Sequence, residues 1–464
     1  MTPVEHAAAV RALQASFDAI PPAERVRLAK RTSNLFRPRT GTGRPWLDVS
    51  GLTRVISVDE VGLTADVQGM TTYEDLVDVT LAHGCMPLVV PQLKTITLGG
   101  AVTGLGIEST SFRNGLPHES VLELDVLTGG GSVVTATADN EHADLFRAFP
   151  NSYGSLGYAT RVRIELERVH QFVRLRHVRF HDLARLVATV GEVMRDHAYA
   201  GQPVDFVDGV VFTATESYLV LGNWADTAPY CTSYDKSLIY YRSIQQRPED
   251  YLRVRDYLWR WDTDWFWCSR AFGAQRPRMR RLWPKRWLRS EVYWKLIAVE
   301  NRYHLAARLD AHQGRPPRER VVQDVEVPLE RTAEFLHWFL DHVPIEPIWL
   351  CPLRLRDEPV GASDASPAGK GWPLYPLQPG RDYVNVGFWS TVEIAPGARD
   401  GDVNRAVEAK VGELGGHKSL YSDAYYDPKA FWLLYGGATY DKAKARYDPD
   451  GRLTGLYDKA VRRT

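Results

Sequence analysis

The stretch from Pro91 to Ser111, PQLKTITLGGAVTGLGIESTS, has the composition of a long ligand-binding loop. Its glycines allow backbone N–H groups to close on a diphosphate with no Cβ in the way. The stretch lacks the Lys-Ser/Thr pair of a P-loop, and its glycine spacing is not that of a Rossmann fingerprint. A flat dinucleotide held by backbone amides is the ligand that remains. The glycines are Gly99, Gly100, Gly104 and Gly106.

Four tryptophans lie close together in the run WRWDTDWFW. A period of two would place pairs of them on one face of a strand, whereas Trp261 and Trp265 would share a face of a helix. The run predicts either an apolar tunnel for a lipid chain or an aromatic core beneath a loop. The four residues are Trp259, Trp261, Trp265 and Trp267.

Residues Arg276–Arg289, RPRMRRLWPKRWLR, follow soon after and are called the basic segment below. A cationic surface with tryptophans suits anionic phospholipid headgroups. Nucleic acid would use the same residues, and a solvated charged face is the third interpretation. The formal net charge of zero argues against nucleic acid. The residues predicted to contact lipid are Arg280, Arg281, Trp283, Lys285, Arg286 and Trp287.

The elements around the glycine stretch follow an α+β pattern. Strands are predicted at residues 53–58 and 63–67, helices at 71–84 and 142–149, and a strand at 159–169, where charged and apolar residues alternate. A second glycine-containing loop, NSYGSLGY at 151–158, lies between the last helix and the last strand.

A chain of 464 residues is too long for one ordinary core, so two or three domains are expected. The N-terminal residues predict an amphipathic helix and not a signal peptide, and no run reaches the roughly 18 apolar residues that span a bilayer. The cysteines show no metal-ligand spacing, so we expect no metal site and reduced core thiols in a cytoplasmic protein. They are Cys85, Cys231, Cys268 and Cys351.

Together these features resemble the FAD-binding fold of the vanillyl-alcohol-oxidase type, also called PCMH-type, over nearly the whole chain. The glycine stretch paired with NSYGSLGY is typical of the flavin fold. PIEPIWLCPLRL at 344–355 and YSDAYYDPKAFW at 421–432 resemble the Δ24-sterol-reductase branch. RLAKRTSNLFR, FRNGLPHESVLELD and RWDTDWFWCSRAFGAQ resemble the actinobacterial flavin reductases that complete 10-methyl-branched (tuberculostearic) fatty acids.

The resemblance implies an α+β fold in three parts. Residues 1–170 would form a two-subdomain FAD-binding domain with an N-terminal helix. Residues 171–400, including 251–294, would form a substrate or cap domain with an antiparallel sheet, and residues 401–464 would return to the flavin site. Many oxidases of this superfamily carry an Arg-Gly-Gly-His loop where this chain reads KRTSNLFR, so we expect noncovalent FAD and disfavour an oxidase.

The resemblance also implies which residues hold FAD, with Lys30 as an alternative to Arg31 for offsetting the diphosphate charge. The expected cofactor-binding residues are Arg31, Thr32, Ser33, Asn34, Pro91, Gln92, Thr95, Thr97, Gly99, Gly100, Gly104, Gly106, Ile107, Glu108, Ser109, Gly154, Ser155, Gly157 and Tyr158.

Reduction of an isolated alkene needs a hydride at one carbon and a proton at the other, from an acid placed in a dry pocket. Residues near the C-terminus are favoured as the acid, because superfamily members bring this segment back over the flavin. The predicted catalytic residues are Glu108, His417, Lys418, Tyr421 and Tyr425, with His118, Asp324, Glu326, Asp423 and Tyr426 as further options.

The resemblance finally implies an FAD-dependent alkene reductase in which NADPH is the electron donor. Its substrate would be a 10-methylene fatty acyl chain esterified in phospholipid, and its product the 10-methyl-branched chain. The alternatives are a Δ24-sterol-type reductase, an FAD-dependent oxidase or dehydrogenase of sugar alcohols or lactones, and a noncatalytic flavin-binding module. Expected partners are the acyl lipid, an anionic membrane at the inner face of the plasma membrane, and a methyltransferase, but no nucleic acid.

Overall fold

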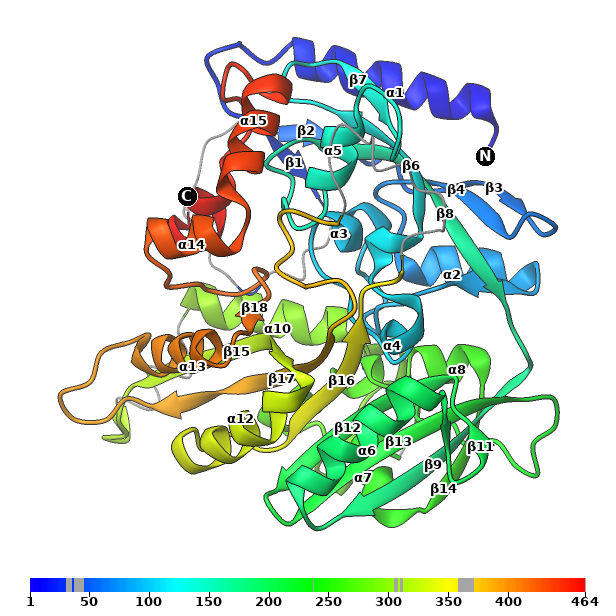
Figure 1. Cartoon of the computed structure of the whole chain (residues 1–464), viewed down its shortest axis with the longest axis vertical. Helices are drawn as coiled ribbons and strands as arrows, with labels where there is room; N and C mark the ends of the chain where they lie inside the picture. Colours follow the sequence, from blue (N-terminus) through cyan, green and yellow to red (C-terminus); the bar gives the residue numbers. More distant parts are fainter. Residues whose placement is uncertain are drawn as a thin grey trace.

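The computed structural model describes residues 1–30, 36, 46–236, 238–303, 308, 312–357 and 371–463. Two antiparallel sheets, each with its own helices, organise this part of the chain, and Figure 1 shows the first sheet above the second. The α+β fold class is confirmed.

The first sheet has the strand order β3-β4-β8-β6-β7, and β5 pairs with β8. Its strands are β3 (Val55–Asp59), β4 (Thr64–Gln68), β5 (Cys85–Pro87), β6 (Val121–Leu127), β7 (Val133–Ala136) and β8 (Tyr158–Arg168). The helices of this unit are α1 (Pro3–Asp18), α2 (Tyr73–Ala82), α3 (Leu98–Thr103), α4 (Ser111–Asn114) and α5 (Ala143–Ala148). A short parallel pair, β1 (Arg27–Ala29) with β2 (Trp46–Asp48), lies outside the sheet.

The sequence signals of this unit explain its elements. Helix α1 begins with a capping box in which Thr2 Oγ1 accepts from the Glu5 N–H and Glu5 accepts from the Thr2 N–H. In β8, Val162, Ile164 and Leu166 are buried, as the predicted alternation requires. The prediction that Pro91–Ser111 is one long loop is wrong, because the side chain of Thr97 caps the short helix α3 inside it.

The second sheet has the order β14-β9-β13-β12-β16-β17-β15-β18. Its strands are β9 (Phe172–Phe180), β12 (Phe206–Thr213), β13 (Glu216–Ala225), β14 (Glu249–Arg253), β15 (Arg318–Pro328), β16 (Ile348–Arg354), β17 (Asp382–Glu393) and β18 (His417–Lys418). Helices α6 (Leu183–Asp196), α12 (Leu329–His342) and α13 (Asp402–Glu413) pack on one face of it with a shared apolar core. Figure 1 shows these three helices in front of the sheet.

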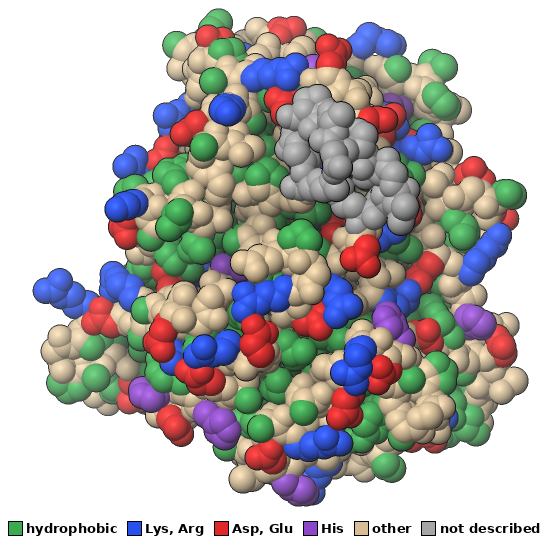
Figure 2. All heavy atoms as spheres, in the orientation of Figure 1, with side chains coloured by type: hydrophobic (Ala, Val, Ile, Leu, Met, Phe, Trp, Pro, Cys, Tyr) green, Lys and Arg blue, Asp and Glu red, His purple; other side chains and the backbone are tan. Residues whose placement is uncertain are grey.

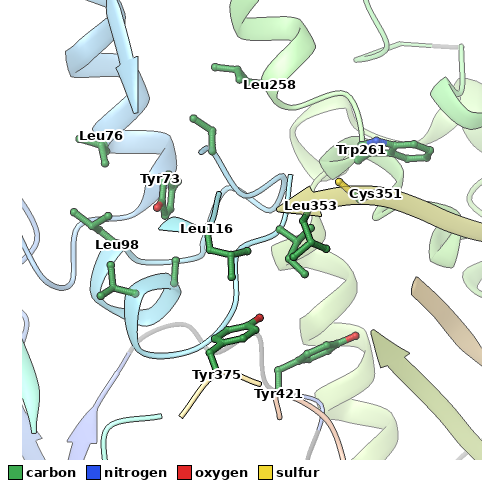
Figure 3. Packing of buried hydrophobic residues seen from close by; sticks show 14 of the residues in the cluster. Tyr73, Leu76, Leu98, Leu116, Leu258, Trp261, Cys351, Leu353, Tyr375 and Tyr421 are labelled. Atoms are coloured by element: carbon green, nitrogen blue, oxygen red, sulfur yellow. The ribbon is translucent and has the colours of Figure 1, made fainter. Parts of the chain in front are cut away.

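The opposite face of the second sheet shares one hydrophobic cluster with the first unit. Figure 3 shows this junction: Leu98 and Leu116 come from the first unit, and Leu353 comes from β16 of the second. Tyr375 and Tyr421 of the same cluster are drawn below them. Because the two units share a core, groups from both can line a common cavity.

The C-terminal region divides between the two units. Strand β18 pairs with β15, whereas α14 (Pro428–Leu434) and α15 (Gly437–Tyr447) lie with the first unit (Figure 1). Arg446 of α15 pairs with Asp144 of α5. The end of the chain thus lies beside the second glycine-containing loop.

The tryptophan-rich run lies in turns between α8 (Val254–Leu258) and α9 (Pro277–Leu282), so neither predicted periodicity, strand or helix, applies to it. The run contains a short 3-10 turn at Asp262–Asp264, and a second one follows it at Cys268–Phe272. Helix α7 (Tyr240–Gln246) lies before α8, and α10 (Ser290–Tyr303) lies after α9. Two of the four cysteines, Cys85 and Cys351, are buried as expected, but Cys231 is exposed. In the part of the chain that is described, no helix is both long and apolar enough to cross a membrane.

Candidate active site

A cavity of about 330 Å³ lies between the two units. The glycine stretch and the 151–158 loop form its walls on the side of the first unit. Strands β15, β16 and β17 and the turn at Trp265 form the walls on the other side. Both glycine-containing segments therefore line one cavity, although residues 112–150 separate them in the sequence.

The predicted cofactor residues divide into three groups. Those that line the cavity are Pro91, Gln92, Thr97, Gly99, Gly100, Gly106, Ile107, Gly154, Gly157 and Tyr158. Those that do not line it are Thr95, Gly104, Glu108, Ser109 and Ser155. Arg31, Thr32, Ser33 and Asn34 lie outside the described residues.

The described lining of the cavity includes four cationic side chains: Arg27, Lys30, Lys459 and Arg463. Lys30 Nζ lies 3.0 Å from Thr97 Oγ1, at the first turn of α3. Lys459 Nζ donates to the carbonyl oxygens of Tyr153 and Gly154, and so ties the C-terminus to the second loop. These positions suit the negative charge of a diphosphate. Sequence reasoning missed Lys459 and Arg463 because only the fold brings the chain end to this loop.

The backbone amides of the glycine stretch are only partly available. The Gly99 N–H donates to the Gly69 carbonyl and the Gly100 N–H donates to Thr97 Oγ1, so these two amides already have partners. By contrast, no acceptor among the described residues is within reach of the amides of residues 105–107, which line the cavity. A buried amide without an acceptor is costly, so these amides are the ones suited to ligand oxygens.

The second loop contains residues with a strained backbone conformation. Asn151 and Tyr153 have positive φ angles of 60° and 49°, followed by Gly154 at 70°. Asn151 Nδ2 donates to the carbonyl oxygen of Leu374, 2.6 Å away, which fixes the turn against the second unit. Residues in such sparsely populated conformations cost about 1–3 kcal/mol each and cluster at binding sites.

Aromatic rings also line the cavity. Trp265 and Phe266 have φ angles of 46° and 58°, an unusual conformation for large side chains, and both line the cavity. Trp389 of β17 lies against Phe266, with ring centroids 4.4 Å apart. Phe36, Trp349 and Tyr421 complete this apolar wall. Trp349 and Trp389 were not predicted, because their strands carry apolar side chains toward both faces.

One carboxylic acid lies in this aromatic part of the cavity. Asp324 of β15 accepts from Asn385 Nδ2 at 2.9 Å and is also hydrogen-bonded to Tyr421. Burial raises the pKa of Asp324 to about 6, although both of these hydrogen bonds oppose the shift. The Tyr421 hydroxyl in turn accepts from the indole N–H of Trp389. Asp324 was a further option for the acid in the sequence analysis, and Tyr421 was a predicted catalytic residue. The structure brings the two together in the cavity wall.

The other predicted catalytic residues do not line the cavity. His417 lies 3.3 Å from Glu326 behind the wall, and burial lowers the pKa of His417 to about 3. Lys418 is buried, lies 3.3 Å from Glu408, and donates to the Asp423 carbonyl. Tyr425 is only partly buried and lies against Arg405.

Glu108 belongs to a buried polar network behind the glycine stretch. It accepts from Gln92 Nε2 at 2.7 Å and lies 3.5 Å from Arg260. Arg260 also pairs with Asp208 at 2.9 Å and stacks on Tyr257. These contacts stabilise the junction of the two units, so the geometry indicates a structural role for Glu108.

The predicted substrate residues lie in different environments. Trp265 lines the cavity, whereas Trp259, Trp261 and Trp267 are buried in the core outside it. The aromatic-core interpretation is therefore right for those three. The prediction that Arg280 is a surface residue is wrong, because its guanidinium is buried and pairs with Asp264 at 2.8 Å. Arg281, Lys285, Arg286 and Trp287 are exposed.

Comparison with known proteins supports the flavin site. Residues 23–137 match the family model described as an FAD binding domain. The chain is 26% identical to the Δ24-sterol reductase of Arabidopsis thaliana over 460 residues, covering 89% of this chain and 76% of that protein. It is also 26% identical to the Homo sapiens Δ24-sterol reductase, covering 90% of this chain and 81% of that protein. Over 32% of the chain it is 34% identical to cytokinin dehydrogenase 6 of Oryza sativa subsp. japonica.

The cavity fits FAD in its chemistry. Its described lining includes both cations and the amides of residues 105–107, which have no acceptor among the described residues, and both suit the oxygens of a diphosphate. The chain therefore carries an FAD-binding domain whose site opens onto an aromatic compartment of the second unit.

Proposed function

We propose that this chain is an alkene reductase that uses NADPH to reduce a 10-methylene fatty acyl chain, esterified in phospholipid, to the 10-methyl-branched chain. It is an FAD-dependent oxidoreductase that acts on a carbon–carbon double bond. The observation that supports an acyl substrate is the aromatic compartment formed by Trp265, Phe266, Trp349 and Trp389. Among the described lining residues, Asp324 is the sole carboxylic acid.

The compartment matches an isolated alkene better than a polar substrate. Trp265, Phe266 and Trp389 present ring faces, which favour a hydrocarbon chain by removing apolar surface from water. A sugar alcohol or lactone would leave its hydroxyl groups without partners against these rings, at a cost for each buried polar group. This argues against the oxidase and dehydrogenase alternatives.

Reduction of the double bond consumes one hydride and one proton. FAD bound in the cavity and reduced by NADPH would provide the hydride, which the more substituted carbon of the methylene branch would accept. Asp324 holds the proton for the terminal CH₂, because its raised pKa keeps a fraction of it protonated near neutral pH. Asn385 and Tyr421 fix the carboxyl group by hydrogen bonds, and the surrounding rings exclude water that would compete for the proton.

A Δ24-sterol-type reductase is the second candidate, and the similarity over nine-tenths of the chain favours it. The chemistry would be the same, since a sterol side-chain alkene is also isolated and also needs an acid and a hydride. The two candidates differ only in the shape of the apolar group that the aromatic compartment accepts.

The test is anaerobic reduction of the FAD-loaded protein by NADPH, followed by mixing with each substrate. We expect NADPH to bleach the flavin, and phospholipid with a 10-methylene acyl chain to restore its absorbance with formation of the 10-methyl product. Restoration only by a Δ24-unsaturated sterol would replace the acyl proposal with the sterol candidate. Bleaching by a sugar alcohol but not by NADPH would contradict both. Turnover only after addition of a methyltransferase would indicate a noncatalytic module.

Trp265→Ala provides a matched variant for this experiment. Loss of the ring is expected to raise KM for the acyl lipid about tenfold, since a large buried apolar contact contributes roughly 1.5–3 kcal/mol, while NADPH still bleaches the flavin. Trp338→Ala on α12 is the control, because this ring lies on the far side of the second sheet. Equal effects of both substitutions would remove Trp265 from the substrate site.

A further inference from the structure

The basic segment lines a second, surface cavity that the flavin site does not use. This cavity has a volume of about 510 Å³ and lies between α7, α9 and the turn before α10. Its ionisable lining residues are Lys236, Arg242, Arg247, Arg280, Arg281 and Lys285, and no carboxylate is among them. A cavity lined by cations alone is suited to an anionic group.

Two of these cations are already neutralised. Arg280 pairs with the buried Asp264, and Arg247 lies 3.6 Å from the buried Asp250. Arg242 bonds to the neutral Gln275 side chain. Within the described chain, Lys236, Arg281 and Lys285 form no ion pair, and the nearby Asp235 bonds to Ser233 instead.

Large apolar side chains are exposed beside these cations. Leu282 at the end of α9 is 78% exposed, Trp287 is 46% exposed and Met279 is 43% exposed. Apolar residues of this size exposed among arginines and lysines are typical of helices that lie in a membrane interface. Nucleic acid would bind to the cations but would not bury the apolar side chain of Leu282. The face in Figure 2, in contrast, mixes Lys and Arg with Asp and Glu.

The helix that follows the basic segment packs against residues that line the flavin cavity. Helix α10 starts directly after the basic segment, and its Trp294 lies 5.3 Å from Trp265 and 4.5 Å from Phe36, measured between ring centroids. Both of those residues line the flavin cavity. On the outer side of α10, Leu296 and Val299 are exposed. One helix therefore separates the basic surface from the aromatic compartment.

We infer that the second cavity and its apolar rim dock the protein on a bilayer that carries anionic phospholipid. A headgroup phosphate would lie among Lys236, Arg281 and Lys285, and Leu282 and Trp287 would enter the acyl region. Charge complementarity selects this occupant, because the cations are concentrated at one place on a chain whose formal net charge is zero. The inference goes beyond the proposed function and holds whichever alkene is reduced.

The test is co-sedimentation of the full-length, FAD-loaded protein with phosphatidylcholine vesicles, with and without phosphatidylglycerol. We expect binding only to vesicles with phosphatidylglycerol, and weaker binding as salt is raised. The double variant Arg281→Ser with Lys285→Ser should lower the partition coefficient by roughly thirtyfold. The double variant Leu282→Ser with Trp287→Ser should lower it by a similar factor through lost apolar insertion.

Arg185→Ser with Arg195→Ser on α6 is the matched control, since it removes two exposed arginines from another surface and should leave binding unchanged. Flavin reduction by NADPH should be the same in all variants, which separates failure of docking from failure of the proposed function. Absence of vesicle binding, equal loss in the α6 control, or tighter binding to duplex DNA than to vesicles would each overturn the inference.

Discussion

The indole Nε1 of Trp389 donates a hydrogen bond to the hydroxyl oxygen of Tyr421, 2.9 Å away. Trp389 lies on β17 and Tyr421 follows β18, so the sheet order brings them together across β15. Because the indole occupies one side of the phenol oxygen, the phenol hydrogen is left for Asp324. In the proposed mechanism, Trp389 therefore positions Asp324 through Tyr421 and carries no proton to the substrate.

Trp389→Phe is expected to slow alkene reduction about fivefold, since one neutral hydrogen bond contributes roughly 1 kcal/mol to the orientation of Tyr421. The reaction should still proceed, because the ring wall is kept. Single-turnover measurement of flavin reoxidation by substrate checks this, and Trp338→Phe on α12 is the control. A reduced rate of flavin bleaching by NADPH in Trp389→Phe would contradict a role in positioning the acid.

Asp324→Asn tests the acid directly. With a pKa of about 6, the wild-type single-turnover rate should fall as pH rises above 6, because the protonated fraction falls. The variant should be slower by about 10²–10⁴-fold and lose this pH dependence. Asp341→Asn, at an exposed position of α12, should keep the wild-type profile.

The raised pKa of Asp324 also predicts that the free energy of unfolding depends on pH. The folded protein binds the Asp324 proton more tightly than the unfolded chain, so this contribution to stability is complete below about pH 4 and is lost as pH rises to about 6. Asp324→Asn should flatten the decrease in the free energy of unfolding over this interval. Urea denaturation across the interval measures it, and an unchanged slope would mean that Asp324 is ionised in the folded protein.

The flavin side of the site was predictable because its signals are local. Turn glycines, the Thr97 cap and the alternation in β8 are all properties of neighbouring residues. The prediction of one long loop was wrong at α3 for a related reason. Glycines suggest an irregular backbone, but the Thr97 cap and packing against Gly69 allow a short helix.

The substrate side was less predictable because its residues meet only through sheet pairing. Asp324 and Asn385 become neighbours through the antiparallel pairing of β15 with β17. In the basic segment, charge alone suggested that every arginine is exposed. The sequence could not show that Asp264 forms a buried pair with Arg280 across a turn.

Gly106 tests how tightly the glycine stretch is packed. A Cβ at this position would lie 2.6 Å from Pro117 Cγ and 2.9 Å from Pro91 Cγ, and neither ring can move away easily. Gly106→Ala is expected to lower the free energy of unfolding by about 1–3 kcal/mol and to weaken FAD retention. Thermal unfolding and the flavin-to-protein absorbance ratio measure these effects. Gly412→Ala in α13, where a Cβ meets nothing within 4 Å, should be neutral or stabilising.

Arg280 and Arg281 are neighbours with opposite environments, and they form a matched pair of substitutions. Arg280→Met leaves the Asp264 carboxylate buried without its guanidinium partner, so the free energy of unfolding should fall by about 3–5 kcal/mol. Arg281→Met changes an exposed side chain and should stay within about 0.5 kcal/mol of wild type. Urea denaturation of both variants checks this.

The loss in Arg280→Met should also depend on pH. Burial already raises the pKa of Asp264 against the opposing effect of Arg280, and removal of the guanidinium raises this pKa further. Protonation of Asp264 then relieves the buried charge, so the difference from wild type should shrink as pH is lowered. A loss that stays constant with pH would show that packing of the arginine stem, and not the ion pair, stabilises this region.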